Sequence, residues 1–147
     1  MDSVIVTLLC LLCGLDLFGA EVIQSDICIY GGTAGGVAAA VQARRMGKSV
    51  VIAEFGNHLG GMTSGGLGAT DIGNKQAIGG IAREFYHLVA QHYARDEARQ
   101  FETRRHYFKD RSRNSSAADL NASDATLWTL FEPHVAEEIF FQMLNMA

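Results

Sequence analysis

The chain has 147 residues, of which 48% are hydrophobic, and its formal net charge at pH 7 is −4. This size and composition suit one folded domain with an apolar core, and they exclude a disordered or fibrous chain. The acidic balance offers no basic surface for nucleic acid, which we do not expect as a partner, and three cysteines are too few for a disulfide framework.

Residues 1–20 form an apolar leader, since Val4–Phe18 is interrupted only by Thr7, Gly14 and Asp16 and is followed by Gly19-Ala20. The stretch resembles the hydrophobic region of a secretory signal peptide, although no Lys or Arg precedes it. It is shorter than the ~20 residues that cross a bilayer, so no stable membrane span is predicted. We expect a signal peptide and a secreted or periplasmic protein. The alternatives are a cytoplasmic protein with a misassigned start, or an N-terminal strand that packs on the domain.

A strand, a glycine turn and a helix are predicted after the leader. The apolar run Asp26–Tyr30 indicates a strand in which Cys28 is a small buried residue. An alanine-rich helix follows from about Ala34 to Met46, and Gly47 stands where a left-handed cap ends a helix. The residues expected to face the sheet are Val37, Ala40, Val41 and Ala43.

A second apolar run, Ser49–Ala53, predicts another strand, which stops at Glu54. A strand, a helix and a second parallel strand make a Rossmann-like β-α-β unit of an α/β fold, the type that binds FAD or NAD(P). Such a unit aims the backbone amides of its first turn and a helix N-terminus at a pyrophosphate. That turn here consists of Gly31, Gly32, Thr33, Ala34, Gly35 and Gly36.

The turn departs from the usual glycine pattern at Thr33, which takes the place of the middle glycine. The Thr33 hydroxyl can donate to a phosphate oxygen, whereas Gly31 allows a sharp exit from the strand and Gly36 allows close packing of the helix. Glu54 lies 23 positions after Gly31, near the ~20 expected for the acid that accepts hydrogen bonds from the adenosine ribose. The negative charge of Glu54 would repel a 2′-phosphate on that ribose, which argues against an NADP-type cofactor. The alternative is a solvated residue at a strand end.

A second glycine cluster, from Gly56 to Gly68, contains six glycines and is predicted to be a loop, because each glycine costs a helix up to ~1 kcal/mol. A nicotinamide-only domain would place an amphipathic helix there. A loop rich in amides suits the longer FAD, and Thr63 and Ser64 can donate to its phosphate or ribityl oxygens. We expect the two glycine-rich bends to hold one flavin nucleotide together. The alternative is a flexible surface loop.

Two further helices are predicted, one from about Ile78 to Tyr93 and one that begins at Glu132-Pro133. Between them, about Arg95 to Asp124 is polar and is expected to be an exposed loop. Two strands leave the sheet incomplete, so we expect residues 21–147 to be the N-terminal part of a longer FAD-binding domain. The apolar stripes comprise Ile78, Ile81, Phe85, Leu88 and His92 in the first helix and Val135, Ile139, Phe140, Met143 and Leu144 in the second.

Four segments, Asp26–Gly36, Glu54, Leu59–Gly68 and Ile78–Tyr86, together resemble the N-terminal part of FAD-dependent oxidoreductases with the glutathione-reductase-type fold. The likeness is strongest to a secreted or periplasmic group associated with xanthan lyase, and weaker to the flavin subunit of heterodisulfide reductase. The resemblance implies that the first turn binds the pyrophosphate of FAD, that Glu54 binds ribose and that the second cluster lies beside the flavin. The matching residues are Gly31, Gly36, Glu54, Gly60, Gly61, Met62, Thr63 and Ser64.

These features predict an FAD-dependent oxidoreductase that moves a hydride or an electron pair between a small organic substrate and an acceptor. Residues 21–147 are expected to be inactive by themselves, and no catalytic side chain is assigned. Some relatives carry 4Fe–4S clusters, whose four thiolates this chain does not supply, so no metal is predicted. His58 is expected to be an exposed loop residue or a phosphate ligand rather than a flavin attachment or an acid/base group. The alternatives are an NAD-binding Rossmann dehydrogenase and a non-catalytic, truncated nucleotide-binding domain.

Overall fold

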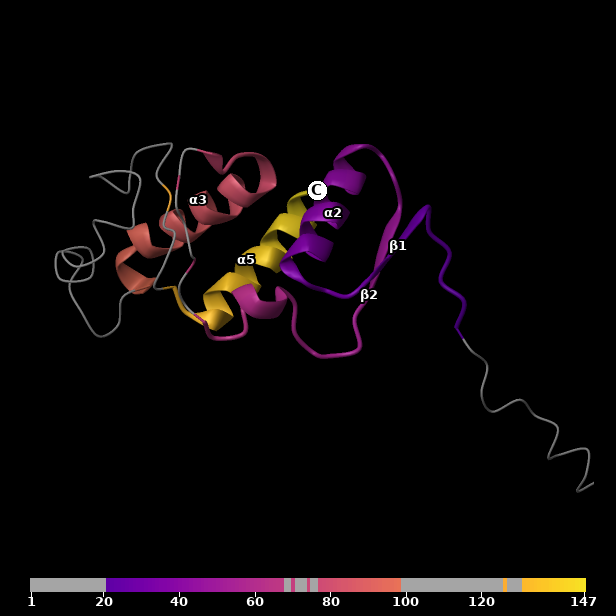
Figure 1. Ribbon diagram of the computed structural model, residues 1–147, viewed down its shortest axis with the longest axis horizontal. Coiled ribbons are helices and arrows are strands. Elements are labelled where there is room, and N and C mark those ends of the chain that lie inside the picture. The colour runs from indigo at the N-terminus through magenta and orange to yellow at the C-terminus, as the bar shows by residue number, and fades with distance from the viewer. Residues whose placement is uncertain (1–20, 68–69, 71–73, 75–76, 99–125, 127–130) are drawn as a thin grey trace, which may run out of the picture.

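The computed structural model describes residues 21–67, 70, 74, 77–98, 126 and 131–147. The predicted leader, residues 1–20, and most of the predicted polar loop lie outside the described residues. No helix of the described part is long and apolar enough to span a bilayer. In chain order the elements are β1 (Ile27–Tyr30), α2 (Ala34–Arg45), β2 (Val50–Ala53), the 3-10 turn η1 (Gly61–Thr63), α3 (Gly80–Ala94), the 3-10 turn η3 (Asp96–Ala98) and α5 (Pro133–Met146) (Figure 1).

The elements β1, α2 and β2 form the β-α-β unit that the sequence predicts. The two strands are parallel and in register from Ile27 opposite Val50 onward. At their start the Asp26 carboxylate accepts hydrogen bonds from the Ser49 amide and hydroxyl, both at 2.8 Å. These bonds lower the pKa of Asp26, and the bond from the backbone amide has the larger effect. Because the two strands are parallel, their carboxyl ends meet at one edge of the sheet.

The ends of α2 follow the prediction closely. Thr33 caps the N-terminus, since its Oγ1 accepts a hydrogen bond from the Gly36 amide at 3.1 Å. The helix ends at Arg45, just before the predicted end, and Gly47 has the left-handed φ of 76°. The buried side chains of α2 are the four that the sequence predicts to face the sheet, namely Val37, Ala40, Val41 and Ala43.

The main apolar core lies among the three helices, and α5 runs between α2 and α3 (Figure 1). Phe85 of α3 stacks on Phe140 of α5, with ring centroids 4.6 Å apart and an interplanar angle of 18°. The predicted stripe of α3 is confirmed for Phe85 and Leu88, whereas Ile78 precedes the helix. The buried residues of α5 are Val135, Ala136, Ile139, Phe140 and Met143, and the predicted Leu144 is partly buried.

Cys28 is exposed, so the prediction that it is buried is wrong. Side chains alternate between the two faces of a strand. Ile29 faces α2, because its Cγ2 lies 3.4 Å from the position that a Cβ on Gly36 would take. Cys28 therefore points to the opposite face of β1, which the described helices leave open.

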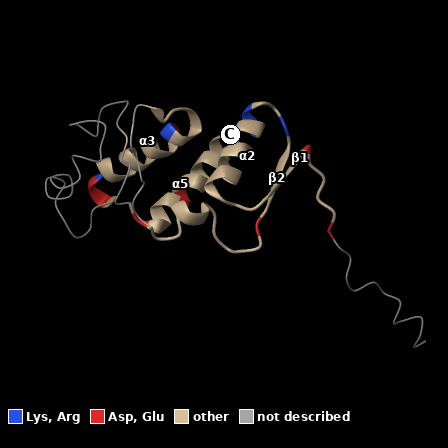
Figure 2. Ribbon diagram, viewed as in Figure 1, with Lys and Arg blue, Asp and Glu red and all other residues tan. Residues whose placement is uncertain are grey.

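Polar contacts also join the helices. Tyr93 of α3 is 1% exposed, and its hydroxyl donates to the Glu132 carboxylate and accepts a hydrogen bond from the Glu132 amide at 2.8 Å. These two hydrogen bonds hold Glu132, the residue just before α5, against α3. Arg45 of α2 forms an ion pair with Glu84 of α3 at 2.7 Å. Elsewhere along the described ribbon, acidic and basic residues occur as short separate segments (Figure 2).

Candidate functional site

The first glycine turn brings β1 and α2 into close contact. Gly31 has a φ of 97°, in the region that favours glycine, and its amide donates to the Ala53 carbonyl at 2.9 Å. A Cβ on Gly36 would overlap the carbonyl oxygen of Gly31. The turn therefore requires glycine at both positions. The first amides of α2, which as in any helix have no acceptor one turn earlier, point toward the carboxyl edge of the sheet.

The second glycine cluster lies directly against the first. The Gly60 amide donates to the Gly32 carbonyl at 2.6 Å, and Gly60 and Thr33 form a parallel β-bridge. Gly60 has a φ of 102°, and a Cβ on Gly61 would lie 3.5 Å from Thr33. Both bends therefore lie together at the carboxyl ends of the strands, as the predicted shared flavin site requires.

Glu54, which follows β2, joins the two glycine clusters. Its Oε2 accepts a hydrogen bond from the Gly32 amide at 2.6 Å, and its Oε1 accepts one from the Gly56 amide at 2.8 Å. These bonds lower the pKa of Glu54, with the Gly56 amide as the larger cause and burial opposing it. The side chain is therefore a carboxylate at neutral pH. A carboxylate has about four lone-pair sites, so at least one stays for a hydroxyl donor beside the amides of Gly56, Gly32 and Phe55.

A cavity of about 470 Å³ opens beside Glu54. It is bounded by α2, β2, the loop after β2 and the second half of α5. Its polar lining includes the side chains of Glu54, Arg44, Asn57 and His58, and aliphatic and aromatic side chains supply the apolar wall. An apolar wall with a few hydrogen-bonding groups is the usual form of a small-molecule site.

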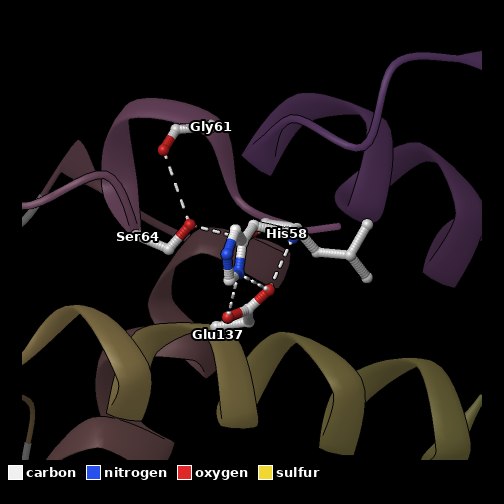
Figure 3. A network of polar contacts seen from close by, with 5 residues as sticks. His58, Gly61, Ser64 and Glu137 are labelled. Carbon is white, nitrogen blue, oxygen red and sulfur yellow. Dashed lines mark hydrogen bonds and ion pairs between the residues drawn. The ribbon is translucent and has the colours of Figure 1, made fainter. Parts of the chain in front are cut away.

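Two sets of hydrogen bonds hold the loop between β2 and η1: one comes from Ser64, just after η1, and the other from Glu137 of α5 (Figure 3). The Ser64 hydroxyl donates to the Leu59 carbonyl and lies 3.4 Å from the Gly61 carbonyl. Its single hydrogen is therefore used inside the loop, and its bond to a phosphate or ribityl oxygen stays a prediction. From α5, Glu137 accepts a hydrogen bond from the Leu59 amide at 2.8 Å and lies 3.0 Å from His58 Nδ1 (Figure 3).

Three other residues near this loop differ in exposure. His58 is 83% exposed, in agreement with its prediction as an exposed loop residue. Met62 is 78% exposed, so its side chain is free to contact a ligand. Thr63 is partly buried and lines a second, mainly apolar cavity of about 260 Å³ together with residues of α2, α3 and α5.

The sequence reasoning missed two neighbours of the site, Glu137 and Phe140. The Phe140 ring lies against Gly60, since a Cβ on Gly60 would be 2.5 Å from Phe140 Cε2. The apolar pattern predicts Phe140 only as a core residue, and it is silent on Glu137. The sequence signal that could have found Glu137 is its spacing from Phe140. Residues three apart share a face of a helix, so Glu137 is placed to contact the same loop as Phe140.

Taken together, the two bends, the helix N-terminus and the carboxylate between them are groups of the kind that bind an anionic nucleotide. Within the described ranges, no group of three His, Cys, Asp or Glu side chains is placed to hold a metal ion. The polar groups that border the site include backbone amides, the Thr33 hydroxyl and the Glu54 carboxylate.

The comparison with protein families identifies the cofactor. A family model described as FAD dependent oxidoreductase matches residues 26–147, a span that includes both glycine clusters, Glu54 and α5. The chain belongs to the FAD dependent oxidoreductase family. FAD is its cofactor, which decides against the alternative of an NAD-binding dehydrogenase. The comparison with curated proteins and the comparison with solved structures each found no match.

The residues of this oxidoreductase fit FAD in charge and in shape. Gly36 and Gly60 contact their neighbours so closely that neither position has room for a side chain. The Glu54 carboxylate adds a charged hydrogen-bond acceptor beside the first turn, and FAD carries hydroxyl groups that can donate to such an acceptor.

Proposed function

We propose that the chain supplies the FAD-binding part of an enzyme that moves a hydride or an electron pair between a small organic substrate and an acceptor. One observation carries the proposal: the Gly60 amide bonds to the Gly32 carbonyl at 2.6 Å, beside Glu54, so both glycine clusters border one site. Bound FAD supplies the redox chemistry. The residues at this edge of the sheet bind and orient the cofactor.

In this proposal the first turn holds the pyrophosphate. Thr33 uses an oxygen lone pair to cap α2, so its hydroxyl hydrogen stays available for a phosphate oxygen. The N-terminus of α2 adds a favourable dipole for the negative charge. The residues that surround the pyrophosphate are Gly31, Gly32, Thr33, Ala34, Gly35 and Gly36.

The adenosine half of FAD lies on the Glu54 side of the turn. A ribose hydroxyl donates to Glu54, and the flat base packs on the apolar wall of the adjoining cavity of about 470 Å³. The flavin half extends in the other direction, along Gly60, Gly61, Met62, Thr63 and Ser64. The bridge between Gly60 and Thr33 supports this path, because it puts the loop next to the phosphate turn.

The motifs also support a narrower assignment. We propose a glutathione-reductase-type FAD domain close to the xanthan-lyase-associated group, on the basis of Asp26–Gly36 and Leu59–Gly68. The apolar stretch Val4–Phe18 supports a secretory leader over residues 1–20 and a secreted or periplasmic location. Residues 21–147 then form the N-terminal part of the FAD-binding domain.

An absorbance spectrum of the purified full chain, with any sequence that its gene encodes beyond Ala147, tests the proposed function. We expect a yellow protein that releases FAD on denaturation, identified by chromatography against FAD and FMN standards. Reduction of the bound flavin by dithionite should bleach the visible bands. A colourless protein that takes up no added FAD contradicts the proposal and favours the non-catalytic nucleotide-binding domain.

We expect the Glu54→Ala variant to bind FAD about 100-fold more weakly, because a hydrogen bond to a charged group is worth about 1.5–3 kcal/mol. The variant loses the ribose acceptor and leaves the amides of Gly32 and Gly56 without theirs. Glu54→Gln keeps one acceptor oxygen and should lose less affinity. Titration of the apoprotein with FAD, followed by flavin fluorescence, gives the Kd. Equal Kd values for Glu54→Ala and the wild type would remove Glu54 from the site.

A further inference from the structure

Glu137 connects α5 to the loop that carries the second glycine cluster. Its Oε1 accepts a hydrogen bond from the Leu59 amide at 2.8 Å, and its Oε2 lies 3.0 Å from His58 Nδ1 (Figure 3). The Glu137 side chain is 20% exposed, whereas that of His58 is 83% exposed. The His58 side chain lies largely in solvent, which weakens its contact with Glu137, so the bond to the Leu59 amide is the stronger of the two. The pKa of Glu137 is lowered mainly by that amide and less by His58.

Leu59 also contacts the first glycine turn. Its side chain occupies the space beside Gly32, where a Cβ would overlap Leu59 Cδ2. The next amide along the chain, that of Gly60, donates to the Gly32 carbonyl at 2.6 Å. On its other side the Gly32 amide donates to Glu54 at 2.6 Å. A continuous path of contacts therefore runs from α5 through the second cluster to the first turn.

The helix α5 is a rigid base for this path. Its N-terminus is fixed by the buried Tyr93 through the two hydrogen bonds with Glu132. One turn after Glu137, Phe140 is 4% exposed and stacks on Phe85 of α3. A functional group is held most precisely when its supports stand on a packed helix rather than on a loop.

We propose that Glu137 is a positioning residue for FAD. It holds Leu59 and Gly60 in place, so that the two glycine clusters keep their register in the absence of cofactor, and it does so without contact to FAD. Holding a loop in its bound conformation strengthens binding, because less freedom is lost when the ligand arrives. This inference rests on the proposed function for its effect on FAD, but the effect on the loop does not require FAD.

Hydrogen exchange in the apo form of the full chain tests the effect on the loop. We expect Glu137→Ala to speed exchange of the Leu59 and Gly60 amides by about tenfold or more, because the acceptor that holds them is a charged group. Amides of α3 should exchange as in the wild type. Glu137→Gln keeps an oxygen that accepts the Leu59 amide, so it should stay within about threefold of the wild type. Glu138→Ala is the matched control, since Glu138 is an exposed carboxylate on the same helix.

Titration with FAD tests the effect on the cofactor. We expect Glu137→Ala to raise the Kd about tenfold, and Glu137→Gln to restore most of the affinity. His58→Ala should change the Kd by about threefold or less, because the contact that it removes is exposed to solvent. Glu138→Ala should leave the Kd unchanged.

Two results would overturn the inference. One is exchange of Leu59 and Gly60 that is no faster in Glu137→Ala than in Glu138→Ala. The other is faster exchange without a change in the Kd for FAD, which would make Glu137 a purely structural residue. If Glu137→Ala does not fold, Glu137→Leu replaces it, because leucine is closer to glutamate in size and also lacks an acceptor for the Leu59 amide: faster exchange of Leu59 and Gly60 supports the inference, and exchange at the wild-type rate overturns it. A wild type that binds no FAD contradicts the proposed function alone, since the exchange result still applies to the loop.

Discussion

The Gly36→Ala variant is expected to lose FAD, with a Kd raised at least about 100-fold, because its Cβ would overlap the Gly31 carbonyl oxygen. The overlapping atom belongs to the backbone, so relief requires that the turn itself move away from α2. That movement also separates the helix N-terminus from the amides that surround the pyrophosphate. Fluorescence titration and the A450/A280 ratio of the purified protein both measure the loss.

Gly79→Ala provides the control for this variant. Gly79 precedes α3, its φ is −132°, and a Cβ there would have no heavy atom within 4 Å. The same chemical change at that position should leave the Kd for FAD within about twofold, since an added methyl group in open space has little to displace. Full occupancy of FAD in Gly36→Ala would contradict the placement of the phosphate at the first turn.

The Gly60→Ala variant is expected to lower both stability and FAD affinity. Gly60 has a φ of 102°, and its Cβ would lie 2.5 Å from both Phe140 Cε2 and Ser64 Oγ. Backbone strain of about 1–3 kcal/mol adds to an overpacking cost of similar size. A combined loss of about 3 kcal/mol would lower the melting temperature by roughly 10 °C. Calorimetry of the apo and FAD-loaded forms measures both effects.

Gly66→Ala separates strain from overpacking. Gly66 has a similar φ of 99°, but a Cβ there would have nothing within 4 Å. It should therefore cost only the strain, which is roughly half of the loss in Gly60→Ala. Phe140→Leu in the Gly60→Ala background should recover part of the loss, because contacting residues are coupled. If Gly60→Ala and Gly66→Ala are equally stable, Phe140 does not confine Gly60.

Most of the β-α-β unit could be predicted because its signals are local. Alanines favour a helix, a glycine after Met46 favours a left-handed cap, and Glu132-Pro133 favours a helix start. Each of these depends on residues that are close in the chain. The structure agrees at Gly47 and at the start of α5.

The features that could not be predicted depend on which segments pack together. Cys28 lies in an apolar run, yet it is exposed because only one face of β1 is covered by α2. The sequence does not tell which acceptor the Ser64 hydroxyl takes, and in the folded loop it donates to the Leu59 carbonyl.

The sequence by itself determined the order of strands and helices, the two glycine-rich bends and the acidic residue between them, because turn and helix preferences act over a few residues. Only the tertiary structure decided which contacts join the second bend to the first and that α5 supports the second bend. The Leu59 amide and the Glu137 carboxylate are 78 positions apart in the chain. A contact over such a separation exists only after packing has brought the helix and the loop together, and no local preference encodes it.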